Sequence, residues 1–188
     1  MTTASELQIP GYIAGTWTID PVHTHVGFVI KHMMVSKVRG NFDTFTGQIL
    51  TAANPSESTV SVTIEVKSIN TGNTMRDDHI RSADFFDAEN HPTITFTSTG
   101  IRQEGGDFYV DGDLTIRGVT KAVSLKTETP EFAQNSAETF KAGFSASTEI
   151  DRTDFGVNYN GPIPGGGLAL GEKVQIVLEV EADLAPAS

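Results

Sequence analysis

Val-Ser-Val-Thr-Ile-Glu-Val-Lys, residues 60–67, alternates apolar and polar side chains at every position. A period of two places one set of side chains on each face of a β-strand, one face dry and the other wet. Similar strand patterns occur at residues 16–20, 22–32, 38–50, 93–97, 108–116, 119–128, 140–150 and 174–181. With residues 16–20 joined to the run that follows them, these make about eight long strands, which predicts an all-β barrel or sandwich.

Turn-forming residues separate these strands. Asn54-Pro55-Ser56 breaks the chain, and Glu104-Gly105-Gly106-Asp107 joins two alternating runs across a short gap, as in a β-hairpin. Arg117-Gly118 does the same for the next pair of strands. Because the linking segments are short and the composition does not shift, we predict one domain at residues 12–184, with flexible tails at 1–11 and 185–188.

One segment departs from the strand pattern. Residues 74–82 are polar and predict a short helix, with Thr74 as its N-cap and Asp77 at the acidic position of a capping box. Asp77 and Arg81 have the favourable i,i+4 order for an ion pair. His91-Pro92 ends any helical tendency and opens the next strand. A helix here would plug or rim one end of a barrel.

The composition excludes several classes of function. The chain has 188 residues, a formal net charge of −11 and no cysteine. A strongly acidic chain is not expected to bind nucleic acid, and disulfides, thiolate metal sites and Cys nucleophiles are excluded. Residues 1–30 hold no Lys or Arg, and residues 1–15 hold no long apolar run. We therefore expect no signal peptide, no stable membrane insertion and a cytoplasmic protein.

Two histidines are the strongest candidates for metal chemistry. His23-Thr24-His25 falls in a predicted strand, so both imidazoles would share one face and could hold one metal ion. A third ligand is needed, and residues 26–42 contain no Asp or Glu. A metal-assisted enzyme that uses His23 and His25 therefore stays an alternative, beside the plainer interpretation that they pack near a barrel end.

Other catalytic patterns are weaker. Gly165-Gly166-Gly167 lacks the Gly-Lys-Ser/Thr ending of a phosphate loop, so it predicts a flexible loop near a barrel mouth. Asp151 and Asp154 flank Arg152, which is typical of a structural turn. The chain has no Gly-x-Ser-x-Gly nucleophile motif. We predict neither an enzyme nor a cofactor.

The apolar residues are more informative. Eleven Phe dominate the aromatic residues. An eight-stranded barrel can be filled by side chains or can leave room for a small ligand. The residues alone leave open a solid core, which would suit an interaction module without a ligand, and a Phe-lined pocket.

Six ordered blocks of sequence together resemble one known family. The blocks, between about residues 12 and 183, are 12–28, 35–47, 68–87, 91–96, 112–121 and 151–156. The third block contains Arg76-Asp77-Asp78-His79-Ile80-Arg81-Ser82-Ala83-Asp84-Phe85-Phe86-Asp87, which resembles the most specific signature of that family. The chain resembles the YceI-like family in these blocks, with His23-Thr24 where that family often has His-Ser.

The resemblance implies a lipocalin-like, single antiparallel eight-stranded barrel that holds an amphiphile in an apolar channel. Polyisoprenoids are the ligand class usually attached to the family, and other long-chain ligands are also associated with it. The implied function is non-enzymatic binding for carriage, storage or sequestration. Family members are commonly dimers, so a homodimer is expected.

Alternation and this resemblance together give a set of expected ligand contacts. The apolar channel is expected to be lined by Phe28, Ile30, Phe42, Phe45, Val62, Ile64, Ile94, Phe96, Phe108, Val110, Phe144, Ile176 and Leu178. Cationic residues near one mouth are expected to meet a polar headgroup. This rim set is His23, His32, Arg76, His79, Arg81 and Arg152.

Overall fold

The predicted strands form one antiparallel sheet that closes on itself. A computed structural model describes residues 7–186. Within them it contains β1 Gly15–Ile19, β2 His25–His32, β3 Ser36–Phe42, β4 Phe45–Thr51, β5 Thr59–Glu65, β6 Ile69–Asn70, β7 Thr93–Glu104, β8 Asp107–Ile116, β9 Val119–Thr127, β10 Glu131–Gln134, β11 Phe140–Asp151 and β12 Leu170–Leu184. Its helices are α1 Thr74–Arg81 and the 3₁₀ turns η1 Pro55–Glu57, η2 Val66–Ser68 and η3 Arg152–Phe155.

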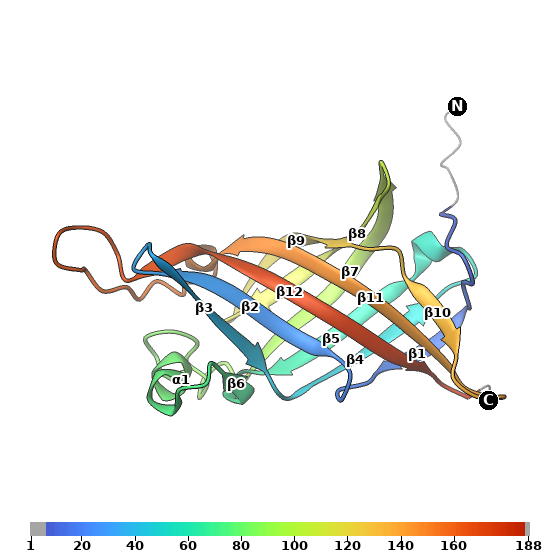
Figure 1. The fold of residues 1–188 in the computed structure, drawn as a ribbon, viewed down its shortest axis with the longest axis horizontal. Helices are drawn as coiled ribbons and strands as arrows, with labels where there is room; N and C mark the ends of the chain where they lie inside the picture. Colours follow the sequence, from blue (N-terminus) through green and yellow to red (C-terminus); the bar gives the residue numbers. More distant parts are fainter. Residues whose placement is uncertain (1–6, 187–188) are drawn as a thin grey trace.

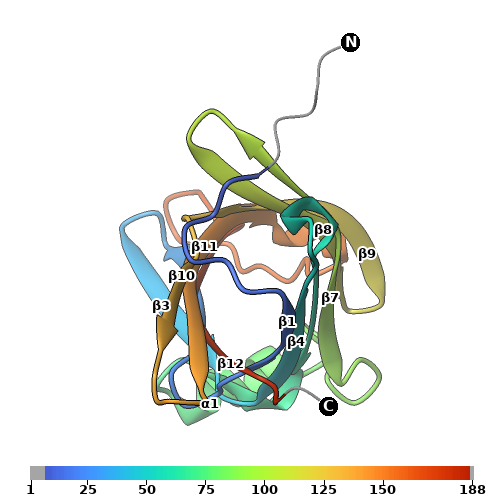
Figure 2. The same cartoon turned by 90° about the vertical axis from the view of Figure 1, so that its right-hand side faces the viewer.

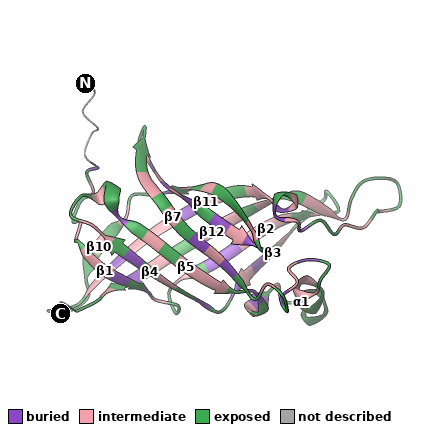
Figure 3. Ribbon diagram, turned by 180° about the vertical axis from the view of Figure 1, so that it is seen from behind, coloured by how far each residue is buried: buried purple, intermediate pink, exposed green. Residues whose placement is uncertain are grey.

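Eight of these strands make a closed barrel, which confirms the predicted fold class. They follow one another in the order β1-β4-β5-β7-β8-β9-β11-β12, and β12 returns to β1. Figure 2 shows the strands as a ring around a common axis. Exposed residues alternate with buried or half-buried ones along β4, and Ile94 and Phe96 are the buried residues of β7 (Figure 3), as a wall with one inner face requires.

The longest strand, β12, joins the two halves of this wall. One edge pairs with β11 from Lys173 to Asp183. The opposite edge pairs first with β2, at Leu170 and through Val174 to Glu179, and then with β1, through Ala182 to Leu184. Strands β2 and β3 therefore extend the barrel at one end, where α1 and β6 also lie (Figure 1).

Two hairpins lie where the turn residues predicted them. Strands β7 and β8 meet at Gly105-Gly106, and Gly105 has a φ of 63°. Strands β8 and β9 meet at Arg117-Gly118, where both residues have positive φ (50° and 73°). Positive φ at both central positions is typical of the type I′ turn, whose twist matches that of the flanking strands.

Several predicted strands have different bounds in the structure, since β7 and β12 run well beyond the predicted 93–97 and 174–181. Two other predicted strands differ for a clear local reason. Residues 38–50 are not one strand but the end of β3 and the whole of β4, because the chain turns at Asp43-Thr44. Phe42 and Phe45 are both buried although three positions separate them, which breaks the period of two. The strand predicted at 22–32 begins at His25, since Asp20 accepts a hydrogen bond from the backbone N–H of Val22 and turns the chain there.

The helix forms as predicted, but its capping differs. Asn73, not Thr74, is the N-cap, and its side chain accepts from the backbone N–H of Arg76. Asp77 is buried and accepts instead from the N–H and hydroxyl of Thr71. Arg81 therefore pairs with Asp78 rather than Asp77. Within residues 7–186 no helix has the length and apolar character to cross a bilayer.

The barrel end that holds β1 and β10 is filled with side chains. Trp17 is 1% exposed, and its indole donates to Thr51 Oγ1 (2.9 Å) and packs edge-on against Phe132. Tyr12 contacts the other side of Phe132 and donates to the carbonyl of Ala52. Leu7, within the predicted N-terminal tail of residues 1–11, is buried. Residues 1–6 and 187–188 of the two predicted tails lie outside the described residues.

Candidate ligand-binding channel

The barrel interior is hollow rather than filled. A cavity of about 420 Å³ runs along the axis, and apolar side chains make up almost all of its wall. This volume is within the range of small-molecule sites, roughly 300–1,000 Å³. Of the two interiors that the residues left open, the structure has the Phe-lined one.

The predicted channel residues converge on this cavity with one exception. Twelve of the thirteen line it, from Phe28 on β2 to Leu178 on β12. Phe108 does not line it, although it is 4% exposed and lies two residues before Val110, which does. Contact of these residues with a ligand stays a prediction.

Sequence reasoning missed part of the wall. Leu114, Ile116, Val123 and Leu125 line the cavity and follow the same alternation on β8 and β9. The periodic signal was therefore present in both segments. Other lining residues lie outside regular strands, and periodicity could not have found them: Phe85, Phe86, Phe155 and Val157.

Glycines on the inner face help to keep the lumen open. Phe28 lies directly across from Gly40 on β3, and its ring occupies the space that a Cβ at Gly40 would take. Phe96 covers Gly112 on β8 in the same way. Because these rings lie against the backbone of a neighbouring strand, they contribute apolar wall without filling the channel.

The cavity reaches solvent at the α1 end. Among its lining residues, only Arg76, His79 and Tyr159 are themselves exposed. The first two lie on α1, and Tyr159 lies in the loop of residues 157–169, which projects beside α1 (Figure 1). The channel mouth therefore lies between the helix and this loop.

Aromatic contacts join the two sides of the mouth, and hydrogen bonds hold the α1 side in place. The His79 ring packs edge-on against Phe85 and Tyr159, with ring centres 5.1 and 5.0 Å apart. His79 Nε2 also lies 2.8 Å from Asp84. Arg76 donates to the hydroxyl and carbonyl of Thr71.

Arg152 brings a buried positive charge to the channel. Its side chain is 6% exposed, and it donates to the carbonyls of Gly171, Val157 and Tyr159. Burial lowers the pKa of the Arg152 guanidinium below its usual value. No carboxylate among residues 7–186 forms a salt bridge with it, and none of their atoms accepts from its Nη2.

Of the predicted rim residues, His32, Arg76, His79 and Arg152 line the cavity, but Arg81 and His23 do not. Arg81 donates to the carbonyls of Lys67 and Ile69, so it ties α1 to the barrel. His23 lies outside the channel, because it belongs to the turn before β2.

His23 belongs to an ion cluster on the outer surface. Its Nδ1 lies 2.7 Å from Asp20 and 3.7 Å from Glu181. Lys141 on β11 approaches the same two carboxylates, at 3.3 and 2.7 Å, and Asp183 at 2.8 Å. His25 is absent from this group of possible ligands among the described residues.

This arrangement overturns the predicted His23–His25 pair. Asp20, His23 and Glu181 could offer three ligand atoms within 4.8 Å of one another. However, the ammonium of Lys141 already pairs with the two carboxylates that a cation would need. The charges lower the pKa of Asp20 to about 2, mainly through its hydrogen bond to His23, and that hydrogen bond raises the pKa of His23. The cluster joins the β1–β2 turn to β11 and β12.

The barrel agrees with comparisons to known proteins. The YceI-like domain family model matches residues 17–182. The chain belongs to the YceI-like family. It is 40% identical to a UPF0312 protein of Photorhabdus laumondii over 152 residues, which cover 79% of each protein.

Solved structures share the fold of this chain. The crystal structure of BcnA from Burkholderia cenocepacia has a TM-score of 0.72 and 28% identity, and the match covers 87% of this chain and 98% of BcnA. A structure described as a polyisoprenoid binding domain from Saccharophagus degradans has a TM-score of 0.65 at 17% identity. That match covers 92% of this chain and 100% of the domain.

The ion cluster predicts a pH-dependent contribution of His23 to stability. Because the folded pKa of His23 lies above 6.5, its contribution is complete below that pH and is lost as the pH rises through the folded value. We expect His23→Gln to lower the urea midpoint more at about pH 5.5 than at about pH 9. His25→Gln, an exposed neighbour outside the cluster, is the control. Equal losses at both pH values would contradict the prediction.

The glycine on the inner face of β3 predicts a second effect. Gly40→Ala places a methyl group within 2.4–2.7 Å of the present Phe28 ring position, so the ring must move. We expect a loss of about 1–3 kcal/mol in unfolding free energy and weaker uptake of a fluorescent long-chain probe. Gly100→Ala is the matched control, because nothing lies within 4 Å of its Cβ position. Unchanged probe affinity in Gly40→Ala would show that Phe28 does not border the occupied space.

Proposed function

We propose that the chain binds one long apolar molecule with a polar head, a polyisoprenoid or another long-chain amphiphile, in the barrel channel. It then acts as a non-enzymatic carrier, storage or sequestration protein. The observation that carries this proposal is the apolar cavity of about 420 Å³, open at the α1 end. An elongated cavity with one mouth suits a chain that enters lengthwise and leaves its polar end near solvent.

Apolar burial supplies much of the expected affinity. Each buried methylene contributes about 0.8 kcal/mol, so about ten of them give roughly 8 kcal/mol before the costs of association. A dissociation constant of 1 μM corresponds to about −8.2 kcal/mol. Because association and ligand ordering are unfavourable, micromolar binding needs a longer buried chain or a recognised headgroup.

Arg152 is the best candidate for headgroup recognition. Nε and Nη1 of Arg152 donate to backbone carbonyls, whereas Nη2 has no acceptor among residues 7–186. No buried side-chain nitrogen in these residues lacks a partner, so Nη2 is open to solvent and can donate to a ligand. A headgroup oxygen at the mouth would supply that acceptor. His32, Arg76 and His79 lie along the same cavity and would add further polar contacts.

The relative from Saccharophagus degradans supports the ligand class, because it is described as polyisoprenoid binding. The alternative of a metal-assisted enzyme loses its main support, since His23 and His25 do not act together. A ligand-free interaction module is disfavoured by the hollow interior. A homodimer and a cytoplasmic location stay predictions.

Uptake of a long-chain probe by solvent-extracted protein tests the proposal. We expect one fluorescent fatty-acyl or prenyl probe to bind per chain. Ile176→Trp, which fills the lumen, should weaken binding by about tenfold or more, the equivalent of about two lost methylenes. Val177→Trp, the next residue on β12 and not part of the cavity wall, should bind as the unsubstituted chain does. Native mass spectrometry before and after organic extraction detects any ligand that the purified chain carries. A chain that takes up no probe and releases no ligand would refute ligand binding.

The charge of Arg152 predicts selectivity among headgroups. Arg152→Gln should weaken binding of an acid-headed probe by about tenfold or more relative to an alcohol-headed probe of equal chain length. The ratio of the two affinities separates headgroup recognition from a general change in the mouth. Arg102→Gln, which removes an exposed arginine paired with Asp111 on the outer wall, is the control. An unchanged ratio would assign Arg152 to loop structure alone.

A further inference from the structure

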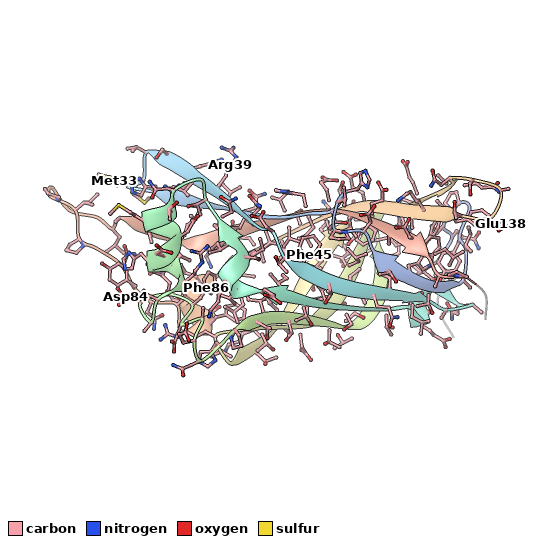
Figure 4. The ribbon with its side chains drawn as sticks, turned by 90° about the horizontal axis from the view of Figure 1, so that it is seen from below. Met33, Arg39, Phe45, Asp84, Phe86 and Glu138 are labelled. Atoms are coloured by element: carbon pink, nitrogen blue, oxygen red, sulfur yellow. The ribbon has the colours of Figure 1, made fainter. Side chains whose placement is uncertain are left out.

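The tip of the β2–β3 hairpin exposes apolar side chains beside the channel mouth. Met33, Met34 and Val35 form this tip and are all exposed, Val35 by 85%. The backbone N–H of Met33 donates to the carbonyl of Ala169, which places the exposed Leu168 next to the tip. Figure 4 shows Met33 at the same end of the molecule as Asp84, just after α1, and far from Glu138. We call Met33, Met34, Val35 and Leu168 the apolar tip.

The backbone of the apolar tip is strained. Met33 and Met34 have φ of 51° and 62°, in the left-handed region that bulky side chains rarely adopt. The N–H of Val35 bonds to the carbonyl of His32, so the two methionines hold the central positions of a tight turn. Asn-Gly is the favoured pair in such turns. This hairpin therefore carries large apolar side chains where smaller residues would be more stable, which points to a role outside folding.

The strands behind the apolar tip are cationic although the chain is acidic. Residues 21–42 contain Lys31, Lys37 and Arg39 but no Asp or Glu, whereas the whole chain has a net charge of −11. Lys31 and Lys37 lie directly across from each other in the β2–β3 register. Like charges in that position repel. No carboxylate among residues 7–186 forms a salt bridge with any of these three cations.

The loop that adjoins the apolar tip adds no opposing charge. Residues 155–171 contain no charged side chain, and the acids that bound this segment are Asp154 and Glu172. An apolar projection with cations behind it and a neutral loop beside it complements the surface of an anionic bilayer, where apolar groups insert below the headgroups and Lys or Arg contacts them.

We propose that the apolar tip docks the protein on an anionic lipid bilayer, with Met33, Met34 and Val35 inserted and the three cations on the headgroups. A stable protein partner normally covers about 800 Å² on each side, and one narrow hairpin tip offers much less. A bilayer needs no such area, because a few inserted side chains and nearby cations act together. Docking in this way brings the channel mouth to the lipid surface.

Vesicle co-sedimentation tests the proposal without any channel ligand. At about 0.15 M salt, where the Debye length is about 8 Å, distant acids are screened while the cations nearest the lipid still act. We expect the unsubstituted chain to sediment with equimolar phosphatidylcholine–phosphatidylglycerol vesicles but not with pure phosphatidylcholine vesicles. Binding should fall at about 1 M salt. A chain that stays in the supernatant with the anionic vesicles would overturn the proposal.

The strained turn provides a decisive variant. Met33→Asn with Met34→Gly removes the two inserted side chains and relieves the strain, so its thermal stability should equal or exceed that of the unsubstituted chain. Its vesicle affinity should fall by about tenfold or more. Val22→Ser, which changes a residue with 82% exposure on the β1–β2 turn, is the matched apolar control. Vesicle affinity that is unchanged by the double substitution would overturn the proposal.

Charge variants and two further measurements complete the test. Lys31→Gln with Lys37→Gln should weaken vesicle binding, whereas Lys121→Gln with Lys126→Gln on β9 should not. Light scattering without vesicles tests whether a second copy of the chain covers the apolar tip instead. If the unsubstituted chain is a dimer and the Met33→Asn, Met34→Gly variant is a monomer, the apolar tip is a dimer contact and the proposal is overturned. Probe uptake by the same variants keeps the two proposals separate. A variant that no longer binds vesicles but still takes up the probe supports the docking proposal and leaves ligand binding in the channel intact.

Discussion

The closure of the sheet through β12 is the constraint on which the rest of the structure depends. A single strand pairs with β11 along one edge and with β2 and then β1 along the other, so the wall of eight strands has no free edge. Closure gives every inner side chain a common interior, and the inner positions are apolar. If β12 paired with β1 alone, β2 and β3 would not extend the wall, and the channel would end before it reached α1.

The hollow interior follows from the size of the barrel together with the placement of small residues. Eight strands leave space for side chains or for one small ligand, and the choice depends on side-chain volume at inner positions. Gly40 and Gly112 receive the rings of Phe28 and Phe96 against the backbone, so a wall rich in phenylalanine still leaves about 420 Å³ free. The filled end around Trp17 and Phe132 shows the other outcome in the same barrel.

The sequence predicted the strands well because their evidence is local and repetitive. Alternation along residues 60–67 or 108–116 needs no knowledge of distant contacts. The hairpins at 104–107 and 117–118 follow from turn chemistry in the same way. A spacing of three between Phe42 and Phe45 marks the break between β3 and β4 in the sequence. Strand-like residues on both sides of it favour one continuous strand, so the break was not predicted. Whether the interior would be hollow could not be predicted, since it depends on how rings from one strand meet glycines on the next.

The candidate site was less predictable because it joins residues that are distant in the chain. The strand that follows His23 holds no acidic residue up to position 42, whereas the partners of His23 are Asp20, just before it, and Glu181 on the last strand. In the sequence, Arg152 is one arginine between two acids, and only the fold shows that it is buried with carbonyl partners on one side and the channel on the other.

Several locally unfavourable features of the protein lie where they can contact a molecule outside it. Arg152 is a buried cation that forms no salt bridge within residues 7–186, Lys31 and Lys37 repel each other across two strands, and Met33 and Met34 hold a strained turn. Each of these lowers stability when the chain is considered alone. All of them lie at the open end of the barrel, whereas the ion cluster around Lys141, in which every charge has a partner, lies on the outer wall away from the mouth. That contrast within one molecule argues that the open end is shaped by what it contacts rather than by folding alone.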